Sequence, residues 1–333
     1  MKSIRKLLSL CFLSLLSLAV IVGCSSSNQS TDTVRLAEVT HSIFYAPLYV
    51  AIGEGFFEDE GIEIDLTTTW GGDKTMTTLL SGGADIALVG AETSIYVYAQ
   101  EANDPAINFA SLTQTDGTFL VAREEIVDFQ WEDLKGSTFL GQRTGGMPQM
   151  VGEHVLRLNG INPKSDLEMI QNIDFGNIPS AFASGTGDFV QLFEPQATLF
   201  ENEGIGHVIA SFGTESGEVP YTVFMAKESY LTENEDIIER FTKALYQAQQ
   251  WVEQAETTEI AEILVPFFDD TPIEVIEQVV DRYKSQGSYA TSPLLQERAW
   301  NNLQDIMESA GELPVRVEYD RLVNTDIANR VIK

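Results

Sequence analysis

The chain contains very few residues of the types that most often carry metal or nucleophilic chemistry. Its only cysteines, Cys11 and Cys24, lie near the N-terminus, so the rest of the chain has no thiol for a disulfide, a nucleophile or a zinc cluster. The three histidines, His41, His154 and His207, share no metal-binding spacing, and neither HExxH nor GxSxG occurs. We therefore expect no metal site, no cofactor and no catalytic residues.

Positive charge is also scarce in this sequence. Twenty lysines and arginines stand against fifty acidic residues, which gives a formal net charge of −30 at pH 7. Such a surface repels nucleic acid, which is therefore excluded as a partner. Hydrophobic residues make up 44% and charged residues 21% of the chain, as in soluble globular proteins. A length of 333 residues is sufficient for two domains.

One long hydrophobic run occurs, at the N-terminus. Three basic residues precede the apolar segment 7–23, as in an export signal. The following IVGC at 21–24 resembles the lipobox of bacterial lipoproteins, in which the cysteine carries lipid (palmitate) and becomes the first mature residue. We predict a signal peptide over 1–23, a lipidated Cys24 and a flexible tether over 24–33. The alternative is an uncleaved anchor; on the preferred interpretation, the domain is exported and anchored to the outer face of the cell membrane.

A short phrase occurs twice in the chain. Residues 81–86 read SGGADI and residues 184–189 read SGTGDF, each between a helical pattern and a strand-like run. The order of elements around the phrase is also repeated, with helices between strands predicted at 34–39, 62–66 and 85–89, and again at 138–140, 167–170 and 189–193. Two βαβαβ units indicate parallel strands with helical crossovers, and hence two α/β lobes.

Two more strand-like runs, 118–123 and 221–227, lie on either side of the second unit. We expect the chain to leave the first lobe through one run and to return through the other, so that two crossover strands form a hinge. This assigns 34–120 and 224–333 to lobe 1 and 121–223 to lobe 2. The predicted fold class is α/β, a two-lobe clamshell whose C-terminal helices pack on lobe 1.

The candidate site follows from the strand order. In open parallel sheets, ligands bind beyond the carboxyl ends of the strands. This rule predicts ligand-binding residues on lobe 1 (Glu38, His41, Phe44, Tyr45, Trp70, Gly71, Gly72, Asp73, Glu92, Thr93 and Gln114) and on lobe 2 (Arg143, Thr144, Gly145, Gly146, Asp174, Phe193 and Glu194). Asp269, in the C-terminal helical region, is predicted to lie outside the cleft.

Acidic and aromatic side chains dominate this set. Carboxylates repel an anion and aromatic walls suit a flat ligand, so a compact ligand with N–H donors, such as an aminated heterocycle, is favoured. Two alternatives stay open. The helices that begin behind Gly71-Gly72 and Gly145-Gly146 offer free N–H groups to an oxyanion, and the acids can instead cap helices.

Three segments carry a resemblance to a known family: FYAPLYVAIGEGFFEDEGIEI (44–64), LLSGGADIAL (79–88) and DFVQLFEP (188–195). They resemble the substrate-binding lipoproteins of ABC importers, in the group whose fold is shared by sulfonate, nitrate and thiamine-pyrimidine binding proteins. The resemblance implies a type II periplasmic-binding-protein clamshell that closes on a small ligand. It also implies delivery to a permease and an ATPase, and a monomeric protein.

The resemblance leaves the ligand open. Pyrimidine-binding relatives carry an Asn and a His just before the YVA helix, and Tyr45 stands where that His would be. A thiamine-related pyrimidine, or another aminated heterocycle, is favoured over sulfonate, taurine or nitrate. The fold also includes an enzyme that makes the thiamine pyrimidine from pyridoxal phosphate with a cysteine-rich iron motif, which this sequence lacks. A ligand sensor without transport is a further alternative.

Overall fold

The computed structural model describes residues 31–333. The predicted signal peptide, Cys24 and most of the predicted tether lie outside the described residues. The tether was predicted to extend to residue 33, but the first strand already begins at Asp32. Within residues 31–333 no helix is both long and apolar enough to cross a membrane.

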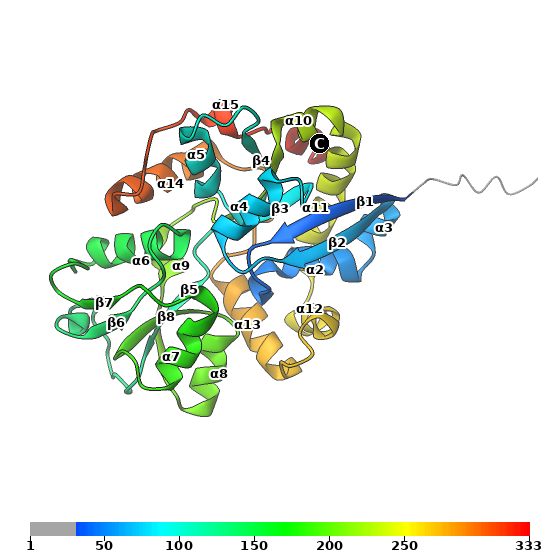
Figure 1. Cartoon of the computed structure of the whole chain (residues 1–333). Coiled ribbons are helices and arrows are strands. Elements are labelled where there is room, and N and C mark those ends of the chain that lie inside the picture. The colour runs from blue at the N-terminus through cyan, green and yellow to red at the C-terminus, as the bar shows by residue number, and fades with distance from the viewer. Residues whose placement is uncertain (1–30) are drawn as a thin grey trace, which may run out of the picture. The chain divides into compact units, whose positions relative to one another are not determined.

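The first of two sheets has five strands in the order β2-β1-β3-β10-β4 (Figure 1). Strands β1, β2 and β3 are parallel, and β10 runs antiparallel between β3 and β4. The strands are β1 (Asp32–Glu38), β2 (Ile62–Thr68), β3 (Ile86–Gly90), β4 (Ala106–Thr113) and β10 (Thr222–Lys227). Strand β4 is buried at every position, as expected where helices cover both faces of a sheet.

The second sheet repeats this pattern with the order β7-β6-β8-β5-β9. Strands β6, β7 and β8 are parallel, and β5 is antiparallel to β8. The strands are β5 (Thr118–Ala122), β6 (Thr138–Leu140), β7 (Glu168–Ile170), β8 (Phe189–Phe193) and β9 (His207–Ser211). Two sheets, each with an antiparallel strand inserted beside a parallel core, match the predicted two-lobe α/β fold.

Helices and single turns of 3-10 helix connect these strands. In the first half of the chain these elements are η1 (Ile43–Tyr45), α2 (Ala46–Gly53), α3 (Phe56–Asp59), α4 (Gly72–Leu80) and α5 (Glu92–Ala99). Around the second sheet they are η2 (Trp131–Leu134), α6 (Met147–Leu158), η3 (Phe175–Asn177), α7 (Ile178–Ala183), α8 (Gln196–Glu203) and α9 (Phe212–Ser216).

The repeated phrase has the same structural role in both sheets. Asp85, directly before β3, accepts the N–H of Arg35 at 3.0 Å and donates its own N–H to the Arg35 carbonyl at 2.9 Å. Asp188, directly before β8, makes the same pair of bonds with Thr138, both at 2.8 Å. Each phrase therefore follows a helix and helps to set the register of two parallel strands.

The two predicted crossover strands belong to different sheets. Strand β5 is hydrogen-bonded wholly within the second sheet and β10 wholly within the first. The boundaries predicted at 120/121 and 223/224 fall inside these strands. We therefore propose the short segments 114–117 and 217–221 as the crossings between the lobes.

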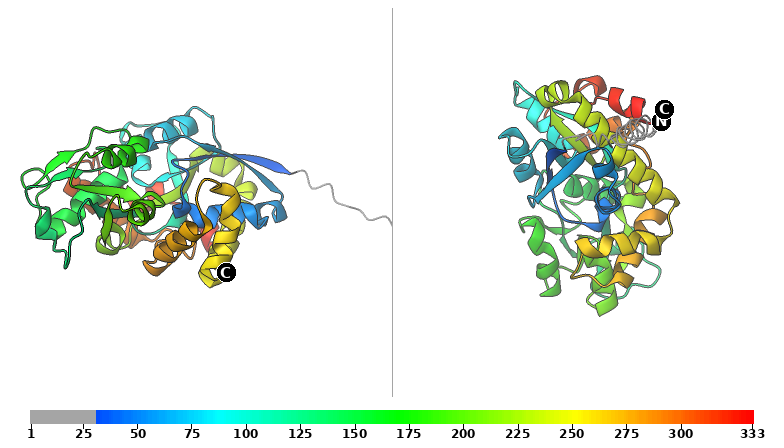
Figure 2. Two further views of the ribbon diagram at one scale, coloured as in Figure 1. Left: turned by 90° about the horizontal axis from the view of Figure 1, so that it is seen from below. Right: turned by 90° about the vertical axis from the view of Figure 1, so that its right-hand side faces the viewer.

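The C-terminal region is helical, but it does not pack on lobe 1 alone. Helices α11 and α12, yellow in Figures 1 and 2, lie against α2 of the first sheet. Helix α14 packs on α6 of the second lobe, and α13 packs on α8 of the same lobe. The elements are α10 (Glu228–Glu233), α11 (Glu235–Gln254), α12 (Thr257–Leu264), η4 (Val265–Phe267), α13 (Ile273–Ser285), α14 (Glu297–Ala310), α15 (Tyr319–Leu322) and α16 (Asp326–Val331).

Candidate functional site

The first cavity has a volume of about 630 Å³ and is lined by residues from the loops and helices that connect the strands of both sheets. Its walls are the segments that follow the parallel strands, together with the start of β10, as the carboxyl-end rule predicts. The predicted residues that line it are Tyr45, Trp70, Gly71, Gly72, Asp73, Glu92, Thr93, Arg143, Thr144, Gly145, Gly146, Asp174 and Phe193. That these residues contact a ligand stays a prediction.

Glu92, the first residue of α5, is a buried acid in the cavity wall. Glu92 is only 4% exposed, and its Oε2 atom has no hydrogen-bond partner within the described residues. The side chain folds over Gly90 at the end of β3, where an added Cβ would lie 2.1 Å from Oε2. Glycine at this position therefore makes room for the carboxyl group.

The burial of Glu92 changes its protonation. Burial raises the pKa of this carboxyl to about 8, although its own N–H and that of Met147 act in the opposite direction. The group is therefore protonated at neutral pH when the cavity holds no charged partner. A neutral carboxyl presents one donor, its O–H, beside one acceptor, its C=O.

Two further unpartnered polar atoms belong to the cavity wall. Within the described residues, Gln142 Oε1 and Tyr221 Oη are buried without a hydrogen-bond partner. Gln142 donates Nε2–H to the Gln191 carbonyl at 2.7 Å, which leaves its oxygen free. Burial raises the pKa of Tyr221, and the nearby Asp116 carboxyl raises it further. No well-aligned hydrogen bond joins Tyr221 Oη to Asp116. Buried polar groups normally have partners, so these atoms indicate a polar ligand.

The sequence analysis missed Gln142, Tyr221 and Tyr96 for different reasons. Gln142 follows β6 by two residues, so the carboxyl-end rule could have identified it. Tyr221 precedes the antiparallel strand β10, and a rule for parallel strands does not cover that position. Tyr96 lies one turn into α5 and reaches the cavity from the helix side.

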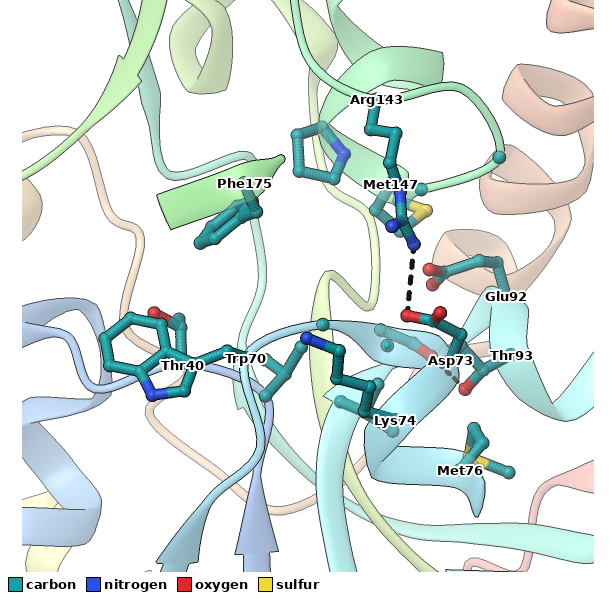
Figure 3. A pocket seen from close by; sticks show the side chains of 18 of the residues that line it. Thr40, Trp70, Asp73, Lys74, Met76, Glu92, Thr93, Arg143, Met147 and Phe175 are labelled. Atoms are coloured by element: carbon teal, nitrogen blue, oxygen red, sulfur yellow. Dashed lines mark hydrogen bonds and ion pairs between the residues drawn. The ribbon is translucent and has the colours of Figure 1, made fainter. Parts of the chain in front are cut away.

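Aromatic rings form opposite walls of the cavity. Trp70 follows β2 and Phe175 belongs to η3, so the two come from different sheets (Figure 3). Trp70 is 50% exposed and has a φ of 57°, which is uncommon for a bulky residue. Strained backbone of this kind concentrates at functional sites. The indole is therefore held where a flat ligand could stack on it.

Two contacts join the lobes across the cavity. Arg143 Nη2 lies 3.1 Å from Asp73 Oδ1 (Figure 3), and Tyr96 Oη donates to the Gly145 carbonyl at 3.2 Å. Both members of the ion pair are about half exposed. Exposed pairs contribute at most about 1 kcal/mol, so this contact can open readily.

Glu38 and His41 do not line the first cavity. Glu38 is fully buried outside the cavity and accepts hydrogen bonds from Tyr49 Oη at 2.6 Å and Thr68 Oγ1 at 2.7 Å. His41 Nδ1 lies 3.1 Å from Glu38 Oε1, and its Nε2 lies 2.7 Å from the Phe267 carbonyl. This network uses both side chains. His41 also lines the second cavity described below, and a contact of either side chain with a ligand stays a prediction.

Phe44, Gln114 and Glu194 do not line the first cavity either, although Glu194 lines the second. Phe44 is buried among aromatic rings and packs over Gly117, where a Cβ would lie 2.7 Å from the ring. Gln114 donates to the Gly287 carbonyl at 3.0 Å, away from the cavity. The Glu194 carboxylate is buried and pairs with Arg282 of α13 at 2.6 Å. Each is held by a distant part of the chain.

A second cavity, of about 410 Å³, adjoins the first. The residues that line both are Thr40, Trp70, Gln142, Phe175, Gly176 and Phe193. The segment 267–271, between α12 and α13, forms another wall of the second cavity. Asp269 belongs to this segment, so the prediction that it lies outside the cleft is wrong. No group of three or more histidine, cysteine or acidic residues in 31–333 could hold a metal ion.

Comparison with known proteins gives three similarities. A sequence profile of the NMT1-like family matches residues 29–265. The chain is 61% identical over 321 residues, 96% of each chain, to a Bacillus subtilis protein named "Putative binding protein YtlA". It is 23% identical over 278 residues, 80% of this chain and 81% of the relative, to the formylaminopyrimidine-binding protein of Halalkalibacterium halodurans.

A solved structure confirms the fold. The alkanesulfonate-binding protein SsuA from Xanthomonas axonopodis pv. citri, bound to MOPS, matches with a TM-score of 0.70 at 17% identity. The match covers 88% of this chain and 98% of that chain. Together with the strand order of the two sheets, it confirms the predicted two-lobe α/β fold of the periplasmic-binding-protein type.

Proposed function

The chain belongs to the NMT1-like family, and on this premise we propose that it is the extracytoplasmic substrate-binding component of an ABC importer. It captures a small ligand between its two lobes and delivers it to the permease and ATPase. A lipid on Cys24 holds it at the outer face of the cell membrane, and it acts as a monomer without catalysis. The ligand stabilises the closed form because it contacts both lobes at once.

The ligand that we propose is an aminated heterocycle, such as a thiamine-related pyrimidine. The observation that carries this proposal is the buried carboxyl of Glu92, whose Oε2 atom has no partner within the described residues, in a cavity walled by Trp70 and Phe175. An amino group beside a ring nitrogen offers a donor and an acceptor, which complement the acceptor and donor of Glu92. Gln142 Oε1 can accept a further N–H.

Sulfonate or nitrate is the alternative ligand class. Lys74 and Arg143 line the same cavity, and so do Gly72 and Asp73 at the start of α4, where N–H groups have no partner within the helix. The alkanesulfonate-binding neighbour shows only that the fold is shared. The relative named for formylaminopyrimidine supports the heterocycle, because the similarity extends over 80% of this chain.

The pH dependence of affinity distinguishes the two classes. A complex of an aminopyrimidine with Glu92 shares one proton between the ring nitrogen and the carboxyl. Above pH 8 both the free carboxyl and the free ligand are deprotonated, so the shared proton must be taken up on binding. Below the pKa of the ligand both are protonated, so one proton must be released on binding. Affinity should therefore fall about tenfold per pH unit above pH 8 and below the pKa of the ligand. Isothermal titration of the full-length protein with 4-amino-5-hydroxymethyl-2-methylpyrimidine measures this profile.

The outcome on the acid side decides between the ligands. A sulfonate needs the proton on Glu92 but carries none itself, so its affinity would fall only at alkaline pH. Binding of taurine, an alkanesulfonate or nitrate with that one-sided profile, and no binding of the pyrimidine, would overturn the heterocycle in favour of the oxyanion.

Trp70 provides a second test of the cavity. Trp70→Ala removes a stacking surface, and we expect the affinity for the pyrimidine to fall about tenfold. The matched control is Leu158→Ala, which removes an exposed apolar side chain outside both cavities and should leave affinity unchanged. Equal affinities of both variants and the unchanged protein would contradict the assignment of this cavity to the ligand.

A further inference from the structure

We propose that the second cavity is a binding site for a positively charged extension of the ligand. The substrate is then an elongated molecule whose flat head binds beside Glu92 and whose cationic tail lies beside Asp269 and Asp270. This inference rests on the proposed function and adds the shape and charge of the substrate.

The two cavities are neighbours and share part of their walls. Trp70, Phe175 and Gln142 line both cavities, so a molecule bound at the first can extend past these side chains into the second. Gln142 is 3% exposed, and its unpartnered Oε1 atom lies in this shared wall. A buried acceptor without a partner at this position indicates that the ligand passes here.

The available volume exceeds what one ring requires. Pockets of about 300–1,000 Å³ hold drug-sized ligands. The first cavity alone has about 630 Å³ and the second adds about 410 Å³. A single aminated ring between Trp70 and Phe175 would leave most of this space to water, whereas an elongated ligand fills it.

The charges around the second cavity determine the sign of the charge that the extension of the ligand carries. No lysine or arginine is among its lining residues in the described chain. His41 is paired with Glu38, whose hydrogen bond raises the pKa of the imidazole, and the Glu194 carboxylate is paired with Arg282. Both carboxylates therefore already have a partner within the protein.

Two acids in the same wall are not compensated. Asp269 and Asp270 form no hydrogen bond or ion pair with any other described residue, and both side chains are exposed. Phe267 and Phe268 stand beside them, and the faces of aromatic rings also attract cations. The first cavity has Lys74 among its lining residues, so a cationic tail is directed away from there and toward the acids.

Three probes with related heads test this inference. 4-Amino-5-hydroxymethyl-2-methylpyrimidine is the head alone, formylaminopyrimidine adds a short uncharged extension, and thiamine joins the head to a cationic ring. Isothermal titration of the full-length protein should show thiamine binding about tenfold tighter than the head, because one added charge pair near the surface contributes on this scale. This advantage should shrink as salt rises, through screening.

Variants identify the acids responsible. The double variant Asp269→Asn/Asp270→Asn should lose most of the advantage of thiamine while binding the head and formylaminopyrimidine unchanged. The matched control Glu274→Gln/Asp281→Asn removes two exposed charges from α13 that do not line the cavity, and it should keep the advantage.

Each result has a separate meaning. If the head binds but thiamine binds no tighter, or the advantage survives in Asp269→Asn/Asp270→Asn, the inference is overturned and the proposed function stands. If no pyrimidine binds at all, the proposed ligand class fails, and this inference fails with it.

Discussion

Replacing Glu92 with glutamine should raise the free energy of unfolding of the ligand-free protein by about 3 kcal/mol at pH 7. The carboxyl has a raised pKa of about 8 in the folded protein, against an ordinary value of 4.5. Between these values the unfolded chain releases a proton that the folded protein keeps, so stability falls as pH rises. From the ordinary pKa of 4.5 to pH 7 is about 2.5 pH units, and each unit lowers the free energy of unfolding by about 1.4 kcal/mol.

The glutamine variant avoids this loss because it is neutral in both states and similar in shape. The two proteins should be equally stable at about pH 4, diverge from there to about pH 8, and differ by a constant amount above it. Urea denaturation at several pH values measures the difference. Glutamine also keeps one donor and one acceptor, so affinity for a neutral ligand should lose its alkaline decline.

A matched control separates burial from helix position. Glu297 occupies the first position of α14, as Glu92 does in α5, but it is exposed. Glu297→Gln should change stability by no more than about 0.5 kcal/mol at any pH. If Glu92→Gln behaved in the same way, the carboxyl would be ionised in the folded protein, and the proposed recognition of the ligand would lose its basis.

Replacing Arg282 with methionine should destabilise the protein by about 3 kcal/mol at pH 7. Arg282 Nη1 lies 2.6 Å from Glu194 Oε1, and the Glu194 side chain is fully buried. Loss of one partner leaves a buried charge uncompensated, which costs several kcal/mol. The least costly response is protonation of Glu194, whose pKa burial already raises.

The pH dependence of this loss identifies its cause. Protonation of Glu194 becomes easier as pH falls toward the ordinary value of 4.5 for a glutamate. The destabilisation should therefore be below about 1 kcal/mol at pH 5 and grow as pH rises. The double variant Glu194→Gln/Arg282→Met should recover most of the loss at pH 7.

Arg316 is a suitable control, because it pairs with Asp305 and Glu308 at an exposed site. Arg316→Met should cost at most about 1 kcal/mol. A loss for Arg282→Met that was equal at pH 5 and pH 7 would show that packing, and not the Glu194 charge, is responsible.

Local patterns in the sequence were sufficient to predict most of the parallel core. Strand β1 alternates between apolar and polar residues and β3 is a short apolar run, and the repeated phrase before β3 and β8 identified two similar lobes. Strand β4 was missed because polar Asn108 and Ser111 interrupt its apolar pattern. In the structure Asn108 Nδ2 donates to the Leu322 carbonyl at 2.8 Å, a partner more than 200 positions away.

The sequence by itself determined the composition of the cleft and the strand ends that form it. It did not distinguish among the acids of those strand ends, because their surroundings come from distant segments. Glu38 is bonded to Tyr49 and Thr68, and Glu194 is paired with Arg282, whereas Glu92 Oε2 has no partner within the described residues. Only the tertiary structure decides which carboxyl is compensated and which one is left for a ligand, since burial and pairing depend on contacts between residues far apart in the chain.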